Sequence, residues 1–223
     1  MSFKENIAYI TSRIAKVAKH WGMDKPDTNI IAVAKKQSVS KIKESLECGH
    51  RLYGENRVQD AYKVWNAKDG FKRDFKDIEL HLIGPLQSNK TKEAVALFDC
   101  IQTLDREKLA DALKAEIEKQ GRQVKIFVQV NTGEEDQKAG VLPRDLDKLL
   151  AHCRDIGLEV RGLMCIPPVD EPASLHFSLL KELANRYGLQ ETSMGMSGDF
   201  EKAVPLNPTY LRIGTALFGE RLN

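Results

Sequence analysis

The chain has 223 residues, of which 42% are hydrophobic and 30% charged, a balance typical of one large or two small α/β domains. Its 34 basic and 32 acidic residues give a formal net charge of +2, which lacks the basic footprint of a nucleic-acid-binding protein. No apolar run reaches membrane-spanning length and the first residues contain no signal peptide, so we expect a cytoplasmic protein without membrane or nucleic-acid partners.

The cysteines indicate a reducing compartment and no metal centre. They occur singly, at Cys48, Cys100, Cys153 and Cys165, without a Cys-x-x-Cys pair or a histidine at ligand spacing. We therefore expect buried, reduced thiols and neither a disulfide framework nor a bound metal.

The N-terminal third of the chain begins with a helix and then a short strand. Apolar residues at spacings of three and four predict a helix from Phe3 to about Gly22. The run Ile30 to Lys35 is rich in β-branched residues and predicts a buried strand that ends in a lysine. The strand is followed by a predicted helix over 39–48 that stops at Gly49.

Helices and strands alternate through the rest of the chain, and the stretch 66–77 is predicted to be a loop. Further strands are expected at 51–56, 79–84, 100–103, 124–131, 159–166, 192–196 and 210–218. Further helices are expected at 58–65, from 90 to about 98, and at 105–120, 143–157, 173–187 and 200–204.

Eight strands with short helical connections predict a single (β/α)8 TIM barrel that spans residues 1–223, with the N-terminal helix outside or beneath it. A doubly wound open sheet is the alternative. It would be expected to carry a Gly-x-Gly-x-x-Gly turn after a strand, and this chain has none.

Lys35 is the first candidate for chemistry. Alternation along the strand places Ile31, Val33 and Lys35 on one face and Lys36 on the other. An inward lysine at the carboxyl end of a buried strand is partly desolvated, which lowers its pKa and makes the amine a nucleophile. The alternative is a side chain that extends into solvent.

The last two strands end in segments that suit an anion. Gly195-Met196-Ser197-Gly198-Asp199 offers a hydroxyl and free backbone N–H groups, although Ser197 is equally interpreted as a helix cap. Gly214 in Arg212-Ile213-Gly214-Thr215 permits close approach of a ligand. Barrels commonly bind phosphate after strands seven and eight.

Arg212 shares a face with Tyr210 and Gly214, so an inward orientation places its charge at the mouth of the barrel. There it requires a carboxylate or a ligand as acceptor, whereas an outward arginine is a plain surface residue.

Other polar residues near strand ends have weaker signals. Asn56 and Gln87 are suited to hydrogen-bond a ligand. His81 is either an acid/base or, more commonly for a lone histidine, a satisfied core residue. Lys138 belongs to a solvated acidic loop or reaches a neighbouring site.

Six motifs in order carry a family resemblance. Besides the lysine at the end of the first strand, they are Tyr53-Gly54-Glu55-Asn56, His81-Leu82-Ile83-Gly84-Pro85-Leu86-Gln87-Ser88-Asn89-Lys90, Arg161-Gly162-Leu163-Met164, Gly195-Met196-Ser197-Gly198-Asp199 and Arg212-Ile213-Gly214-Thr215-Ala216-Leu217-Phe218-Gly219. Together they closely resemble the YggS-like pyridoxal phosphate homeostasis proteins over essentially the whole chain.

The resemblance implies an alanine-racemase-like barrel that carries pyridoxal 5′-phosphate (PLP) as a Schiff base on Lys35. It implies phosphate contacts at Ser197, Gly214 and Thr215, and places Arg212 near the pyridine nitrogen. With Asn56 and Met196 these residues form the expected cofactor site. The family often has Ser-Lys-Thr-Lys-Pro around the reactive lysine, whereas Gln37 replaces the second lysine here, which removes support for a relay at that position.

An arginine beside the pyridine nitrogen makes PLP a weak electron sink, because strong carbanion stabilisation uses a carboxylate there. The chain ends at Asn223, eight residues after Thr215, so we expect no second domain of the racemase type. We therefore expect a monomeric PLP-binding protein of vitamin B6 homeostasis, with little or no turnover, that supplies apo PLP-dependent enzymes.

Two alternatives remain open. A PLP-dependent amino-acid racemase would need a base such as His81 or Tyr53 opposite Lys35. A cofactor-free Schiff-base aldolase acting on a phosphorylated sugar would use the same lysine and phosphate site.

Overall fold

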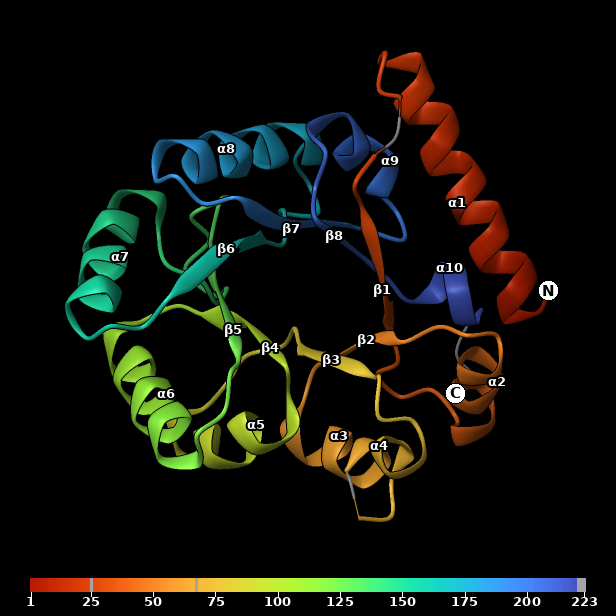
Figure 1. Cartoon of the computed structure of the whole chain (residues 1–223). Helices are drawn as coiled ribbons and strands as arrows, with labels where there is room; N and C mark the ends of the chain where they lie inside the picture. Colours follow the sequence, from red (N-terminus) through yellow and green to blue (C-terminus); the bar gives the residue numbers. More distant parts are fainter. Residues whose placement is uncertain (25, 67, 220–223) are drawn as a thin grey trace.

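The computed structural model describes residues 1–24, 26–66 and 68–219, and its eight parallel strands close into a barrel surrounded by helices (Figure 1). Each strand pairs with the next one in the sequence, and β1 (Asn29–Val33) closes the barrel against β8 (Tyr210–Ile213). The strands between them are β2 (Leu52–Glu55), β3 (Glu79–Leu82), β4 (Cys100–Leu104), β5 (Lys125–Val130), β6 (Val160–Cys165) and β7 (Glu191–Met196). The predicted (β/α)8 fold is confirmed.

Helices cover the outside of the barrel (Figure 1). They are α1 (Phe3–His20), α2 (Val39–Glu47), α3 (Val58–Trp65), α4 (Phe71–Asp74), α5 (Thr91–Leu97), α6 (Glu107–Gln120), α7 (Leu146–Asp155), α8 (Ala173–Arg186), α9 (Phe200–Ala203) and α10 (Thr215–Phe218), with the 3-10 helices η1 (Ser88–Lys90), η2 (Pro143–Asp145) and η3 (Val204–Leu206). Among the described residues, no helix combines the length and the apolar character needed to cross a bilayer.

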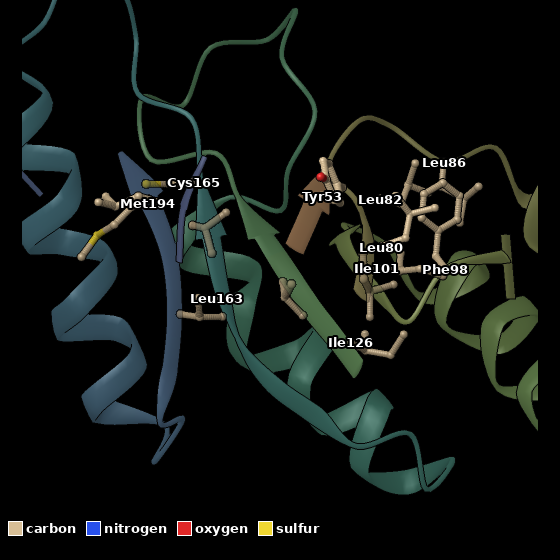
Figure 2. Packing of buried hydrophobic residues seen from close by; sticks show 14 of the residues in the cluster. Tyr53, Leu80, Leu82, Leu86, Phe98, Ile101, Ile126, Leu163, Cys165 and Met194 are labelled. Carbon is tan, nitrogen blue, oxygen red and sulfur yellow. The ribbon is translucent and has the colours of Figure 1, made fainter. Parts of the chain in front are cut away.

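The alternation of side chains along each strand creates two apolar layers. One set points into the barrel, where Ile31, Phe127 and Tyr210 pack together. The other set points outward to the helices, and Figure 2 shows Leu80 and Ile101 in this layer. Full burial of an aliphatic or aromatic side chain contributes about 1.5–3 kcal/mol, so both layers stabilise the scaffold that holds the strand ends.

Helix α1 lies outside the barrel, beside α9, α10 and α2 (Figure 1). Its first turn is stabilised by a capping box between Ser2 and Glu5. The buried Asn6 side chain donates a hydrogen bond of 2.7 Å to the carbonyl oxygen of Leu217, and the rings of Phe3 and Phe218 lie 5.3 Å apart. Helix α1 therefore holds α10, which directly follows the last strand.

Three local expectations were wrong. The predicted loop 66–77 contains α4, where Phe71 packs 5.8 Å from the Trp65 ring. The predicted strand 210–218 ends at Ile213, and the next residues form α10 because Leu217 and Phe218 are buried in the core under α1. Cys48 is exposed, whereas the other three cysteines are buried as expected. In the first two cases tertiary packing outweighed local propensity.

Candidate functional site

A pocket of about 280 Å³ lies at the carboxyl ends of the strands, the face on which TIM barrels build their active sites. Residues that follow β1, β2, β7 and β8 contribute to its wall. All seven residues expected to bind the cofactor line it: Lys35, Asn56, Met196, Ser197, Arg212, Gly214 and Thr215. The fold thus brings together residues that are up to 180 positions apart, from 35 to 215.

Lys35 lies in a turn two residues beyond β1 and lines the pocket together with Val33, as alternation predicts. The turn is closed by a 2.9 Å hydrogen bond from the Gln37 N–H to the Ala34 carbonyl oxygen. Lys36 takes a left-handed backbone conformation with φ 58° and is exposed, whereas Lys35 is half-buried. The two adjacent lysines therefore have different surroundings, and Lys35 is the one at the pocket.

Arg212 is a buried cation held by two neutral groups. It is 3% exposed, and its guanidinium donates 2.7 Å hydrogen bonds to Ser193 Oγ and to the Cys165 carbonyl oxygen. Burial lowers the pKa of the Arg212 guanidinium, because desolvation disfavours the charged form. A cation in this environment gains from an electron-rich ligand in the adjoining pocket.

Ser197 joins the two turns expected to bind an anion. Its Oγ accepts hydrogen bonds from the backbone N–H groups of Gly214 and Ala216, at 3.2 and 3.3 Å. Asp199 Oδ1 accepts the Met196 N–H at 2.6 Å, which closes the turn after β7. Because the Ser197 oxygen already accepts two hydrogen bonds, its own hydroxyl hydrogen is available to donate to a ligand oxygen.

Asn56 reaches the pocket through a close backbone crossing. A Cβ atom at Gly84 would lie 2.2 Å from the Asn56 carbonyl oxygen, so only glycine allows this approach. The segments after β2 and β3 are therefore in direct contact, and half-buried Asn56 is presented to the ligand pocket.

His81 and Tyr53 lie away from the pocket. His81 is fully buried near the amino ends of the strands, with Nε2 3.0 Å from Glu79 Oε1 and Nδ1 2.8 Å from the Gln102 amide nitrogen. Desolvation lowers the pKa of its imidazole. Tyr53 points outward to Ser45, with 2.8 Å between the two hydroxyl oxygens, and burial raises its pKa to about 12.

Two other candidates are also placed elsewhere. Gln87 lines a different cavity, which shares Asn56 with the first. Lys138 forms an ion pair of 2.6 Å with Glu135 in the loop after β5. Gln37, the position at which the chain departs from the family pattern, does line the pocket.

Sequence reasoning missed the groups that support the site. Ser193 and Cys165, which hold Arg212, face it from β7 and β6. Glu55 ends β2 and is buried, and its Oε1 accepts the Trp65 indole N–H at 3.0 Å. Burial raises the pKa of the Glu55 carboxyl to about 7, opposed by the Trp65 hydrogen bond and by the charge of Lys35. A carboxylate at the end of a strand between Gly54 and Asn56 was the available signal.

Known proteins match this chain over nearly its whole length. The family model described as alanine racemase, N-terminal domain, matches residues 2–222. The pyridoxal phosphate homeostasis protein of Vibrio cholerae is 37% identical over 99% of this chain and 97% of its own length. The protein of the same name from Aquifex aeolicus is 35% identical over 99% of both chains.

Solved structures give the same picture of the fold. PipY of Synechococcus elongatus, solved with PLP bound, is 33% identical with a TM-score of 0.80, over 98% of this chain and 100% of that chain. An alanine racemase of Clostridium difficile matches with a TM-score of 0.71 at 12% identity, over 98% of this chain and 58% of the racemase. The second match is a likeness of fold alone.

Proposed function

The chain belongs to the alanine racemase N-terminal domain family, within the group of pyridoxal phosphate homeostasis proteins, and from this we propose that it binds PLP on Lys35 and buffers the cofactor in the cytoplasm. In this proposal a single-domain monomer holds PLP reversibly and passes it to apo PLP-dependent enzymes, with little or no turnover of its own.

The buried Arg212 is the observation that carries the proposal. Its two hydrogen-bond partners are neutral, so the pocket favours a ligand atom with a free lone pair, such as a pyridine nitrogen. Lys35 supplies an amine to the same pocket, and Ser197 and Thr215 supply hydroxyl groups suited to a phosphate, beside Gly214. The residues present fit an aldehyde, a ring nitrogen and a phosphate in one ligand.

PLP would supply an aldehyde, and Lys35 is the residue whose amine would form a C=N bond with it, with loss of one water. Arg212 remains protonated under ordinary conditions and donates its N–H groups, so it does not deliver a proton to the ring. Strong carbanion stabilisation uses a ring-protonating carboxylate, and no Asp or Glu lines the described pocket.

Storage is favoured over racemisation by what the pocket lacks. A racemase needs a second acid/base opposite the lysine, yet neither His81 nor Tyr53 lines the described part of the pocket. The proposal therefore predicts that D- and L-amino acids are not interconverted above the rate of free PLP. Steady turnover that Lys35→Ala abolishes would instead favour the racemase.

The test is the visible spectrum of the purified full-length chain after incubation with PLP. We expect yellow absorbance that borohydride bleaches, with a pyridoxyl label on Lys35 found by mass spectrometry. Lys35→Ala should stay colourless, whereas Lys36→Ala, at an exposed neighbour, should be labelled like the original chain. A label elsewhere, or no colour, would contradict the proposal; borohydride trapping of a sugar phosphate on Lys35 by a colourless protein would support the aldolase.

Transfer is tested separately, by mixing the loaded chain with an apo PLP enzyme in the presence of a trap for free PLP. Recovery of activity despite the trap is expected for direct transfer. Recovery that the trap prevents would limit the role to storage.

A further inference from the structure

A second cavity, of about 650 Å³, lies beside the cofactor pocket, and Gln87 and Lys90 in its wall have no part in the proposed function. It is formed by the segments after β2 and β3, and its wall includes Asn56, Arg57, Val58, Leu86, Gln87 and Lys90. Asn56 lines both cavities, so a ligand in the second one would contact a residue that also faces the first.

The charged residues that line this second cavity are both basic. Arg57 and Lys90 line it, and its described wall contains no Asp or Glu. Arg57 is exposed and forms no ion pair with a described residue, and the amine of Lys90 lies 3.3 Å from Glu93 in a partly exposed pair. The side-chain amides of Asn56 and Gln87 add hydrogen-bonding capacity beside these cations.

The same wall has an apolar part. It consists of the exposed Pro85, which lines the cavity together with the buried side chains of Val58 and Leu86. A bare inorganic ion would leave this surface uncovered, whereas an organic anion could cover it and still meet the cations.

The cavity is preformed because its loop is held at several points. Arg106 Nη2 donates hydrogen bonds to the Leu86 carbonyl oxygen at 3.0 Å and to Ser88 Oγ at 3.3 Å. The Thr91 hydroxyl donates to the Ser88 carbonyl oxygen at 2.9 Å. A fixed wall spares a ligand the entropy cost of ordering the loop.

We propose that this second cavity binds a small organic anion, a carboxylate or phosphate monoester with an apolar part, through Arg57 and Lys90. The inference stands apart from the PLP proposal, because Arg57 and Lys90 line the second cavity and do not line the cofactor pocket.

Two-dimensional NMR of the ¹⁵N-labelled full-length chain tests it, since amide shifts locate a bound ligand. The probes are phenyl phosphate and 3-phenylpropionate, which separate the two kinds of anion, with inorganic phosphate as the bare ion and 3-phenylpropanol as the neutral analogue. Each is titrated into untreated protein and into protein treated with PLP and borohydride, in which the first pocket is filled if the proposed function holds.

We expect at least one aryl anion to give saturable shifts at the amides of Val58, Gln87 and Lys90 in both samples, with tighter binding than inorganic phosphate. Combining Arg57→Gln with Lys90→Gln should weaken this binding about tenfold or more, since each removes a charge-assisted contact. Lys63→Gln removes an exposed cation outside the cavity, from helix α3, which begins directly after Arg57, and should leave the binding unchanged.

Shifts confined to the amides of Gly198, Gly214 and Thr215 would place the anion in the cofactor pocket and overturn the inference. Equal shifts with 3-phenylpropanol, or equal weakening by Lys63→Gln, would also overturn it. If PLP does not label Lys35, the titration of the untreated protein still tests the anion site by itself.

Discussion

The Arg212 guanidinium donates a 2.7 Å hydrogen bond to the hydroxyl of Ser193, and both side chains are buried. Of the described residues that line the cofactor pocket, two are cations, Lys35 and Arg212, and only Arg212 is buried. Ser193 is thus a neutral anchor for this buried cation. Its hydroxyl lets the guanidinium keep its charge available to a ligand, which a carboxylate at this place would neutralise.

Ser193→Ala is expected to destabilise the chain by about 1–3 kcal/mol, because one Arg212 N–H loses its partner in a buried place. Urea unfolding of the ligand-free protein measures the effect. Ser12→Ala, at an exposed position of α1, is the matched control and should change stability by less than about 0.5 kcal/mol. Equal stability of the two variants would mean that the Arg212–Ser193 hydrogen bond contributes nothing.

Gly84→Ala is expected to destabilise the chain by about 1–3 kcal/mol, because the new Cβ would lie 2.2 Å from the Asn56 carbonyl oxygen and must displace backbone. Thermal or urea unfolding reports the loss. Gly198→Ala is the comparison, since nothing lies within 4 Å of its added Cβ. A Gly84→Ala protein as stable as Gly198→Ala would show that the crossing of the two segments tolerates separation.

Much of this architecture could be predicted from periodicity alone. The barrel of eight strands is confirmed, and of the two orientations that alternation allowed for Lys35 and for Arg212, the structure has the one that faces the pocket. The partnership of Arg212 with Ser193 could not be predicted, because the β7–β8 register shifts between Ser193 and Met196. A register shift of this kind depends on packing between strands and leaves no periodic signal.

The position of His81 was ambiguous for a similar reason. A lone histidine in an apolar strand fits an acid/base or a core residue, and its depth within the barrel depends on partners that are distant in sequence. Its ring packs 4.9 Å from that of Tyr210, the first residue of β8, and it hydrogen-bonds to Gln102 of β4. These contacts hold it at the amino end, away from the pocket.

Lys36→Gly is expected to be more stable than Lys36→Val by about 1–2 kcal/mol, because the position has φ 58° and a β-branched residue is strained there. Urea unfolding of the two variants gives the difference. The same pair at Asp170, an exposed loop residue without positive φ, should show no such advantage for glycine. A similar preference at both sites would mean that the turn after β1 stores no strain.

Glu55→Gln is expected to remove a loss of stability that the original chain shows as the pH rises. The folded-state pKa of Glu55 is raised to about 7 by burial, above the unfolded value of about 4.3, so the folded state holds a proton that the unfolded state has released between these pH values. Glu55 therefore destabilises the fold increasingly from pH 5 to pH 8, by an amount on the order of a few kcal/mol.

Urea unfolding at pH 5, 6, 7 and 8 should show the stability of Glu55→Gln increasing relative to the original chain across this window. Glu47→Gln, at the exposed end of α2, should follow the original chain at every pH. Parallel curves for Glu55→Gln and the original chain would mean that the Trp65 hydrogen bond and Lys35 keep the carboxyl ionised at pH 5, and that Glu55 does not titrate near neutrality.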